Sequence, residues 1–565
     1  MKQKVIGLLS RHLGLSKKEV SALIEQPKPE FGDYAFPCFS LAKKEHKNPI
    51  EIAKDIASKL RPKLPKEISK IEAVNGYINF FVNKAIFVNA IVNAILKKKE
   101  KYGSSNLGNG KKILIEHTSI NPNSPPHIGT ARGALIGDSI VRLLIFQNYN
   151  PEVHYYINDV SKQVALLVIS CKGNEKFDNM LGIYVKAAKK LKQKKFEKEV
   201  FAALKKLEQH DKMTIKKFKS IVNTCVRGQR KILSQLDIHY DFFDYESDYL
   251  NKKLRYVIQK LKKSGKLFKD ESGRLVLNQA SNGLEKEMKK PLLVLTRSDG
   301  TGLYALRDLA YTIDKLKRIK QNIIVLGEEH KLYFKQLSAA LKLLGFDAPK
   351  VLHYSHVLIQ TKAGKRKMSK RRGELVLLSH FINEAVKKAK SAIKERKSRG
   401  DARAIALAAV KYSILKTEQN KNVLFNWDEA LNFEGNSGPY LQYAYARASS
   451  ILRKLEKERK IKKKIKEKTY GADFKELKNK KEIELIKQLA LFPTVVEDAT
   501  LQLKPHLVAN YIFRLSQLFS EFYSECPVIK AKAGLREARI ALVKATRQVL
   551  GNSLCLLGVK ALERM

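Results

Sequence analysis

A strand-loop-helix pattern between Lys111 and Phe146 constrains the fold of this chain more than any other feature. The run KKILIEHTS, from Lys111 to Ser119, is apolar enough to form a buried strand, and NPNSPP follows it as a loop. Residues 131–146 then carry apolar side chains at helical spacing. The expected buried face consists of Ala131, Leu135, Ile136, Ile140, Leu143 and Leu144. Strand, loop and helix in this order form half of a βαβ unit, so we expect an α/β domain with a parallel sheet.

The length of 565 residues exceeds one hydrophobic core and predicts roughly three or four domains. The first 85 or so residues alternate helical stretches with short strands, and the turn-rich KYGSSNLGNGKK follows as a linker. A lysine-rich helical stretch at about 185–219 precedes the strand-like runs PLLVLT and NIIVLG, which indicates an insertion in the α/β domain. From Asp401 onward helical periodicity dominates. The expected parts are residues 1–100, residues 110–385 with a helical insertion near 165–290, a connecting helical segment at 386–434, and a helical domain at 435–565.

The charge of the chain points to a polyanionic partner. Lys and Arg total 109 and Asp and Glu total 56, which gives a formal net charge of +53. Such a field attracts phosphate backbones, so nucleic acid is the expected partner, although a general lysine enrichment in the organism would give the same composition. Hydrophobic residues make up 44% of the chain, which is enough for folded cores.

Two further observations bear on location and cofactors. No apolar run approaches the ~18 residues that span a bilayer, and Arg11 and His12 interrupt the first apolar stretch. We therefore expect a soluble, cytoplasmic protein without a signal peptide. The cysteines form no Cys-x-x-Cys pair, so we expect buried thiols in a reducing compartment, with neither a disulfide framework nor a zinc site. They are Cys38, Cys171, Cys225, Cys526 and Cys555.

The stretch SPPHIGTARG, residues 124–133, lies at the predicted start of the helix that follows this first strand. A helix N-terminus favours anions because its free N–H groups and its dipole point at whatever lies there. Gly129 would let an adenine or ribose approach the backbone closely. His127 would donate a hydrogen bond to a phosphate oxygen as charge builds on it. The alternative is an ordinary capping or packing histidine.

A second motif, GKRKMSKRRG, places Lys367, Met368, Ser369 and Lys370 on a basic loop that could close over a triphosphate. Taken alone, it is equally an ordinary solvated loop. A His-x-Gly segment followed at domain-sized separation by Lys-Met-Ser-Lys resembles the paired signatures of class I aminoacyl-tRNA synthetases. The resemblance implies that an amino acid is activated with ATP on a Rossmann-type domain and then transferred to tRNA.

Longer stretches resemble one family of that class, the arginyl-tRNA synthetases. They are SINPNSPPHIGTARGALIGDSIVRLL, YYINDVSKQ, TRSDGTGLYALRDLAYTIDK, YFKQLSAALKLLG, GPYLQYAYARASSIL and the final LLGVKALERM. FGDYAFPCFSLAK and NGYINFFV are similar to that family's additional N-terminal domain, which meets the elbow of the tRNA. The resemblance implies an α/β fold class: a Rossmann-type catalytic domain, an α+β N-terminal domain and an all-α C-terminal anticodon-binding domain. It also implies L-arginine, tRNA(Arg) and ATP with Mg²⁺ as substrates, and a monomer.

The resemblance also assigns site residues. The arginine-binding positions fall on Glu116, Ser119, Asn121, Tyr304, Asp308 and His330. The ATP-binding positions fall on Pro126, His127, Ile128, Gly129, Thr130, Asp138, Lys367, Met368, Ser369 and Lys370, with His127, Lys367 and Lys370 catalytic. Tyr443, Arg447 and Met565 are candidates for anticodon contacts, because an aromatic ring or a guanidinium plane can stack on an unstacked base; the alternative is that the aromatic residues belong to the core. Carboxylates suit a planar, permanently charged guanidinium. Outside the family context, Asp308 could cap a helix, Glu116 could face solvent, Tyr304 could belong to the core and Asp138 could lie on a helix surface.

The chain departs from the family pattern at two positions. Thr130 stands where a second histidine is usual, so this position can donate a hydrogen bond but carries no charge. Lys370 is present where many relatives lack the second lysine, and Arg371 and Arg372 add further charge. The stretch from Arg453 to Lys468 holds ten basic and three acidic residues and is expected to contact tRNA phosphates. No residue is indicated as a general base for the transfer step.

Three other functions remain open from the sequence. A cysteine-specific synthetase would share the architecture but is expected to carry a Cys/His zinc site. A smaller nucleotidyltransferase would leave the helical end unexplained. A non-catalytic tRNA-binding relative would keep the basic surface, but His127, Gly129, Lys367 and Lys370 favour ATP chemistry.

Overall fold

The computed structural model describes residues 1–25, 27–250, 252–280, 282–361, 364–367, 376–396, 399–462 and 474–565. By their contacts these residues form two compact units. The first contains residues 1–99, 451–490 and 518–548, and the second contains residues 100–450, 491–517 and 549–565.

The N-terminal part of the first unit is a small α+β layer. A three-stranded antiparallel sheet has the order β1-β3-β2, and Asn75 and Gly76, both with positive φ (49° and 79°), form the tight turn between β2 and β3. An Asn-Gly pair between two apolar strands is the strongest short-range signal for such a hairpin. The elements are α1 (Lys2–Leu13), α2 (Lys17–Leu23), β1 (Tyr34–Pro37), α3 (Phe39–Glu45), α4 (Pro49–Leu60), β2 (Ile68–Val74), β3 (Tyr77–Val82) and α5 (Lys84–Lys98).

The centre of the second unit is a five-stranded parallel sheet with the order β11-β10-β4-β5-β6. Its strands are β4 (Lys112–Glu116), β5 (Asn150–Ile157), β6 (Phe242–Tyr245), β10 (Asn322–Gly327) and β11 (Lys350–Tyr354). The first strand was expected to run to Ser119, but it ends at Glu116. The backbone of Thr118 and Ser119 has positive φ (81° and 40°), which turns the chain out of the sheet. Such a conformation is rare for a β-branched residue and is found mostly at functional sites.

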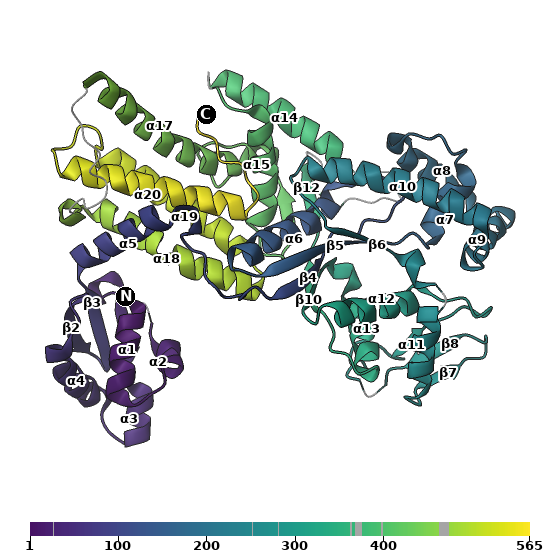
Figure 1. Cartoon of the computed structure of the whole chain (residues 1–565), viewed down its shortest axis with the longest axis horizontal. Helices are drawn as coiled ribbons and strands as arrows, with labels where there is room; N and C mark the ends of the chain where they lie inside the picture. The colour runs from purple at the N-terminus through teal and green to yellow at the C-terminus, as the bar shows by residue number, and fades with distance from the viewer. Residues whose placement is uncertain are drawn as a thin grey trace. The chain divides into compact units, whose positions relative to one another are not determined.

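Helix α6 (Ile128–Phe146) packs on this sheet, as the βαβ pattern predicts (Figure 1). All six residues of the predicted apolar face are buried. The helix lies very close to its neighbours because it presents glycines to them. A Cβ on Gly133 would lie 2.6 Å from the Tyr354 ring, and a Cβ on Gly137 would overlap the buried ring of His117.

Arg132 fixes the same helix with a buried charge. Its guanidinium donates to the carbonyl oxygens of Ser355 (2.7 Å), His356 (3.2 Å) and Glu418 (3.0 Å). Burial lowers the pKa of Arg132 to about 10. Three carbonyl acceptors compensate for part of the cost of burying this cation, so α6 is tied to the segment after β11 and to the residues that follow α15 (Ala402–Leu415).

Two insertions interrupt the sheet. A helical subdomain with its own apolar core lies between β5 and β6, and a small antiparallel sheet of order β7-β8-β9 follows β6. NIIVLG returns to the main sheet as expected, whereas PLLVLT forms β9 of the small sheet, where it pairs with β8. These elements are α7 (Lys162–Ser170), α8 (Met180–Lys190), α9 (Lys194–Glu208), α10 (Lys212–Ser234), α11 (Lys252–Lys262), β7 (Leu267–Lys269), β8 (Leu275–Asn278), β9 (Leu292–Val294), α12 (Tyr304–Arg318) and α13 (Lys331–Leu343).

The described residues after β11 are mostly helical and include a small sheet of order β13-β12-β14. Its elements are β12 (Val357–Thr361), β13 (Gly364–Lys367), α14 (Leu378–Glu395), α15, β14 (Val423–Phe425), α16 (Trp427–Ala430), α17 (Gly438–Lys462), α18 (Lys480–Gln502), α19 (His506–Glu525) and α20 (Leu535–Leu556). Among the described residues, no helix is long and apolar enough to cross a membrane.

The close packing of α6 leads to a stability prediction. We expect Gly137→Ala to destabilise the protein by about 1–3 kcal/mol, because the added methyl group must displace the His117 ring. Gly182→Ala is the matched control, since Gly182 lies in α8 with nothing within 4 Å of an added Cβ. The control should be neutral or slightly stabilising, because alanine favours helix. The midpoint of urea unfolding for both variants checks this, and equal midpoints would contradict the packing argument.

Candidate active site

His127 caps the N-terminus of α6, which begins at Ile128, three residues before the helix start at Ala131 that the periodicity predicted. The Thr130 hydroxyl accepts a hydrogen bond from the backbone N–H of His127 (3.1 Å) and donates one to its carbonyl oxygen (2.7 Å). Thr130 therefore closes the first turn and fixes the backbone that carries His127. Position 130 has this capping role here instead of presenting a second imidazole.

The segment that follows the basic loop lies directly against the histidine loop. Ile128 N–H donates to Val376 O (3.2 Å), and Leu378 N–H donates to Pro126 O (2.8 Å), so residues 126–128 and 376–378 pair as an antiparallel bridge. Lys367 ends β13, and nothing is described of its side chain. Met368, Ser369, Lys370, Arg371 and Arg372 lie outside the described residues. The structure thus brings the flanks of the two motifs together, although they lie far apart in the sequence.

Asp308, in the second turn of α12, is a partly buried carboxylate held by two tyrosines. Tyr156 donates to one carboxylate oxygen (3.0 Å) and Tyr333 donates to the other. Burial raises the pKa of Asp308, and the negative charge of Glu116 raises it further, while the two hydroxyls oppose the shift. Within the described part of the chain, no lysine, arginine or histidine nitrogen lies within 4.0 Å of this carboxylate. Asp308 is therefore an oriented anion without a cationic partner of its own.

Glu116, at the end of β4, has such a partner. Lys315 of α12 donates to its carboxylate, and both side chains are buried, with 4% and 6% exposed. The Lys315 ammonium also lies 4.1 Å from the centre of the Tyr311 ring. Ser119 donates weakly to the same carboxylate (3.4 Å). The charge of Glu116 is thus balanced within the protein.

The loop between β4 and α6 is hydrogen-bonded to two helices of the helical subdomain, α7 and α10. Asn121 donates through its side-chain amide to Gln163 (3.2 Å), and the side-chain amide of Gln229 donates to the carbonyl oxygens of Asn121 and Ser124, both at 3.0 Å. Gln229 is fully buried and also accepts from Tyr155 (2.8 Å). The predicted residues Glu116, Ser119 and Asn121 therefore lie on one braced turn.

Tyr304 and His330 lie at the periphery of this region. Tyr304 is 52% exposed, and its ring centre lies 5.1 Å from that of Tyr333, the tyrosine that holds Asp308. The His330 side chain is 52% exposed and lies 3.9 Å from the Glu329 carboxylate. Tyr304 thus contacts the ring of Tyr333, which donates a hydrogen bond to Asp308. His330 instead lies beside the carboxylate of Glu329, the residue before it in the sequence.

Asp138 lies away from the histidine loop, about 15 Å along α6 from Ile128. Its carboxylate pairs with Arg142 at 2.7 Å, and Arg142 also pairs with Asp237 at 2.9 Å. Burial raises the pKa of Asp138, and burial lowers the pKa of neighbouring Lys411 to about 8. Lys411 donates to the carbonyl oxygen of Gly558, so this charge cluster packs against the C-terminal segment.

Tyr443 and Arg447 lie one turn apart on α17, with the Arg447 guanidinium 4.7 Å from the centre of the Tyr443 ring. Tyr443 is 38% exposed. Tyr445 of the same helix donates to Glu563 (3.2 Å), which places the chain end at Met565 near α17. Helix α17 runs through Lys462, and the rest of the basic stretch as far as Lys468 lies outside the described residues.

Sequence reasoning missed three side chains that bind the carboxylates of Asp308 and Glu116: Tyr156, Tyr333 and Lys315. One signal was available, because Asp308, Tyr311 and Lys315 are spaced three and four residues apart and therefore share one face of a helix. In the described ranges, no group of three or more His, Cys, Asp or Glu side chains could hold a metal ion.

The chain is similar to known proteins over its whole length. Residues 91–427 match the catalytic domain of class I (R) tRNA synthetases, residues 1–82 match the arginyl tRNA synthetase N-terminal domain, and residues 441–565 match the DALR anticodon binding domain. The arginine--tRNA ligase of Pyrococcus furiosus is 35% identical over 634 residues, covering 100% of this chain and 99% of the relative. That of Methanocaldococcus jannaschii is 37% identical over 568 residues, covering 97% and 96%. The structure of Thermus thermophilus arginyl-tRNA synthetase matches with a TM-score of 0.82 at 26% identity, covering 100% of both chains.

The buried pair of Glu116 and Lys315 leads to a second prediction. Lys315→Met would leave the Glu116 carboxylate buried without its cation, so we expect a loss of about 3–5 kcal/mol in the free energy of unfolding. The double variant Glu116→Gln/Lys315→Met should lose less, because no uncompensated charge remains. A double-mutant cycle from urea unfolding measures the coupling. Additive losses would show that the two side chains act independently.

Proposed function

Since the chain belongs to the arginyl-tRNA synthetases, we propose that the pocket around Asp308 binds the substrate arginine and that the loop around His127 binds ATP. The protein is an arginine--tRNA ligase. It activates L-arginine with ATP to arginyl-adenylate, releasing pyrophosphate. It then transfers the arginyl group to the 3′-terminal adenosine of tRNA(Arg), releasing AMP.

Asp308 is the observation that carries the assignment of the arginine pocket. A guanidinium is planar and permanently charged, and it presents a fork of N–H donors that matches a carboxylate. Asp308 offers such a carboxylate, already oriented by Tyr156 and Tyr333 and without a cation of its own among the described residues. Because Lys315 balances Glu116, we assign the net attraction for substrate to Asp308.

The remaining predicted residues complete the proposed pocket. Glu116, Ser119 and Asn121 would line it from the braced loop after β4 and would help to orient the α-amino group. Tyr304 would supply an aromatic wall, because its exposed ring lies beside Tyr333. We also assign His330 to the rim of the pocket.

For ATP, we propose that His127 and Gly129 contact the nucleotide at the N-terminus of α6, with Pro126 and Ile128 on the same turn and Thr130 holding it in place. The basic loop from Lys367 to Lys370, with Met368 and Ser369, would neutralise the β- and γ-phosphates. Asp138 is omitted from this proposed site, because its carboxylate pairs with Arg142.

The proposed chemistry depends on positioning and electrostatics. The arginine carboxylate attacks the α-phosphate in line and pyrophosphate leaves, with His127, Lys367 and Lys370 stabilising the charge that develops on the phosphates. Mg²⁺ enters this proposal as part of the ATP substrate complex, since a divalent cation neutralises charge on the triphosphate.

We extend the proposal to tRNA and to assembly. Tyr443, Arg447 and Met565 would contact the anticodon, because an aromatic ring with a stacked guanidinium offers planes on which an unstacked base can lie. The net charge of +53 suits binding to tRNA, and the repulsion between two copies with this charge favours a monomer. A cytoplasmic location is part of the same proposal.

The role of Asp308 gives a third prediction. Asp308→Asn keeps the shape of the side chain but removes the charge, so the dissociation constant for arginine should rise by the equivalent of about 2–5 kcal/mol. Asp314→Asn is the control on the same helix, because Asp314 is more exposed and pairs with Lys253, and it should leave arginine binding unchanged. Calorimetric titration with arginine measures both.

The same assignment fixes the direction of the pH dependence. The pKa of Asp308 is raised in the empty pocket, so arginine binding should be full above that pKa and should weaken as the pH falls through it. An ordinary, exposed aspartate would lose charge only at lower pH. Asp308→Asn should remove this dependence, and an unchanged pH profile would contradict the assignment.

The fourth prediction concerns the first step of the reaction. ATP-pyrophosphate exchange should occur with arginine and not with lysine or cysteine, and His127→Ala should reduce it about 10²- to 10³-fold. Each amino acid is assayed with and without a tRNA(Arg) transcript, which shows whether tRNA completes the site. Exchange with cysteine would reassign the substrate, and no exchange in any mixture would favour a non-catalytic tRNA-binding protein.

A further inference from the structure

A buried ion pair lies next to Asp308 at the start of α12. Arg307 donates through its guanidinium Nε to the carboxylate of Glu246 at 2.5 Å, and the two side chains are 3% and 0% exposed. Glu246 follows β6 and begins a short 3₁₀ helix, η5 (Glu246–Tyr249). Its second carboxylate oxygen is buried and has no hydrogen-bond partner among the described residues. Neither member of this pair belongs to the site residues assigned above.

Glu246 is the acid that balances the charge of Arg307. The other two nitrogens of the guanidinium donate to the backbone, Nη2 to Val160 O (3.3 Å) and Nη1 to Gly302 O. Nη1 also lies 3.9 Å from the carboxylate of Glu208, but that carboxylate pairs with a second arginine at 3.2 Å. In the part of the chain that the structure describes, Glu246 is therefore the carboxylate nearest to Arg307, and the guanidinium is held at all three nitrogens.

The charge of Arg307 acts on Asp308 although the two side chains form no ion pair. Burial is the main cause of the raised pKa of Asp308, and the positive charge of Arg307 opposes that shift. Burial also raises the pKa of Tyr156, whose hydroxyl donates to Asp308, and Arg307 opposes this shift as well. Charges act over such a separation because buried surroundings screen them poorly. An unbalanced Arg307 would therefore repel a second guanidinium bound to Asp308.

Arg307 carries the same guanidinium group as the substrate. A carboxylate accepts either one, because both are planar, permanently charged and present a fork of N–H donors. An arginine pocket beside a protein arginine must therefore prevent that side chain from weakening the attraction for the substrate. The carboxylate of Glu246 does so by neutralising Arg307 and by occupying its Nε.

We propose that Glu246 is a positioning residue for arginine binding, which pairs with Arg307 and thereby keeps the charge of Asp308 available to the substrate guanidinium. Glu246 acts through Arg307 and does not itself contact the substrate. This inference rests on the proposed function, because it takes Asp308 as the carboxylate that accepts the substrate.

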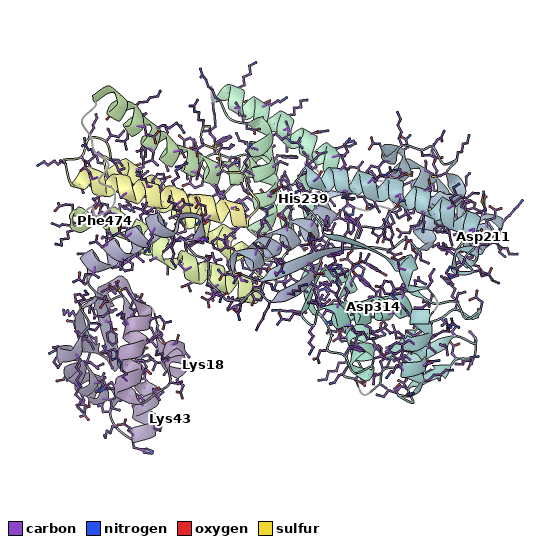
Figure 2. The ribbon with its side chains drawn as sticks, viewed as in Figure 1. Lys18, Lys43, Asp211, His239, Asp314 and Phe474 are labelled. Carbon is purple, nitrogen blue, oxygen red and sulfur yellow. The ribbon has the colours of Figure 1, made fainter. Side chains whose placement is uncertain are left out.

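An exposed ion pair on the same helix supplies the control. Asp314, labelled in Figure 2, pairs with Lys253 at 2.5 Å, and the two side chains are 39% and 47% exposed. Solvent and salt screen an exposed pair, so removing the charge of Asp314 should have little effect at Asp308.

The test compares Glu246→Gln, the double variant Glu246→Gln/Arg307→Gln and the control Asp314→Asn with the unmodified protein, each as the full chain. Calorimetric titration measures the dissociation constants for arginine and for ATP. Burial raises the pKa of Glu246 to about 8, so the titrations are made at about pH 9, where its carboxylate is ionised. Binding of ATP shows that each variant is folded.

Glu246→Gln should raise the dissociation constant for arginine about tenfold or more, because it leaves the charge of Arg307 unbalanced. The double variant should regain most of the lost affinity, since it removes that charge as well. ATP affinity should stay the same throughout, and Asp314→Asn should match the unmodified protein. The proposal is overturned if Glu246→Gln binds arginine as tightly as the unmodified protein. It is also overturned if the double variant binds arginine no better than Glu246→Gln, as a purely structural role of the pair requires.

A second readout does not depend on the folding of Glu246→Gln. As the pH falls through the pKa of Glu246, its carboxylate becomes neutral and Arg307 loses its balancing charge, so arginine binding by the unmodified protein should weaken. The double variant carries neither charge and should lack this step, and equal pH profiles for the two proteins would contradict the proposal. Both proteins keep the other titratable groups that face the pair, which are Asp308 of α12, Tyr156 of β5, Tyr333 of α13, Glu208 of α9 and Asp159 after β5.

Asp308→Asn distinguishes a failure of this proposal from a failure of the arginine pocket. If Asp308→Asn leaves arginine binding unchanged, the pocket assignment fails, and the role of Glu246 fails with it. If Asp308→Asn weakens arginine binding but the double variant does not recover the affinity lost in Glu246→Gln, the pocket assignment stands and only the role of Glu246 fails.

Discussion

The close packing of α6 against the end of β4 is the constraint on which the rest of the site depends. Glycines at 133 and 137 let the helix approach the rings of Tyr354 and His117, and the buried Arg132 holds it to three backbone carbonyls. The helix start, and with it His127, is thereby fixed relative to the turn after β4. Because residues 376–378 hydrogen-bond to that start, the segment carrying the basic loop takes its position from the same helix.

The two carboxylates near this helix, Glu116 and Asp308, differ because a cation balances the negative charge of Glu116 and no cation within 4 Å in the described residues balances that of Asp308. Burial is the main cause of the raised pKa of Asp308, and the negative charge of Glu116 adds to it, so two carboxylates without cations would be costly here. Lys315 neutralises Glu116, and two tyrosine hydroxyls hold Asp308 without neutralising it. Of these two carboxylates, the charge of Glu116 is therefore balanced by a cation within 4 Å, whereas Asp308 is held only by neutral hydroxyls.

The sequence was sufficient for the parts of the fold that follow from local patterns. The apolar face of α6, the strand at Ile113–Ile115 and the return of NIIVLG to the same sheet all followed from hydrophobic spacing. PLLVLT had the same apolar character but pairs with β8, and pattern alone does not identify a strand's partner. The early end of β4 was also missed, because the residue types threonine and serine do not predict the positive φ that Thr118 and Ser119 adopt. The pairing of Glu116 with Lys315 depends on residues 199 positions apart and needed the fold.

The C-terminal segment accepts hydrogen bonds from α6, α15 and α17 through its backbone carbonyl oxygens. Ser139 of α6 donates to Leu556 O (2.8 Å), Lys411 of α15 donates to Gly558 O, and Gln442 of α17 donates to Lys560 O (2.8 Å). The same five-residue stretch therefore contacts the helix that begins at His127 and the helix that carries Tyr443. This arrangement gives Asp138 a structural role, since its carboxylate and the Arg142 side chain pack against Gly558.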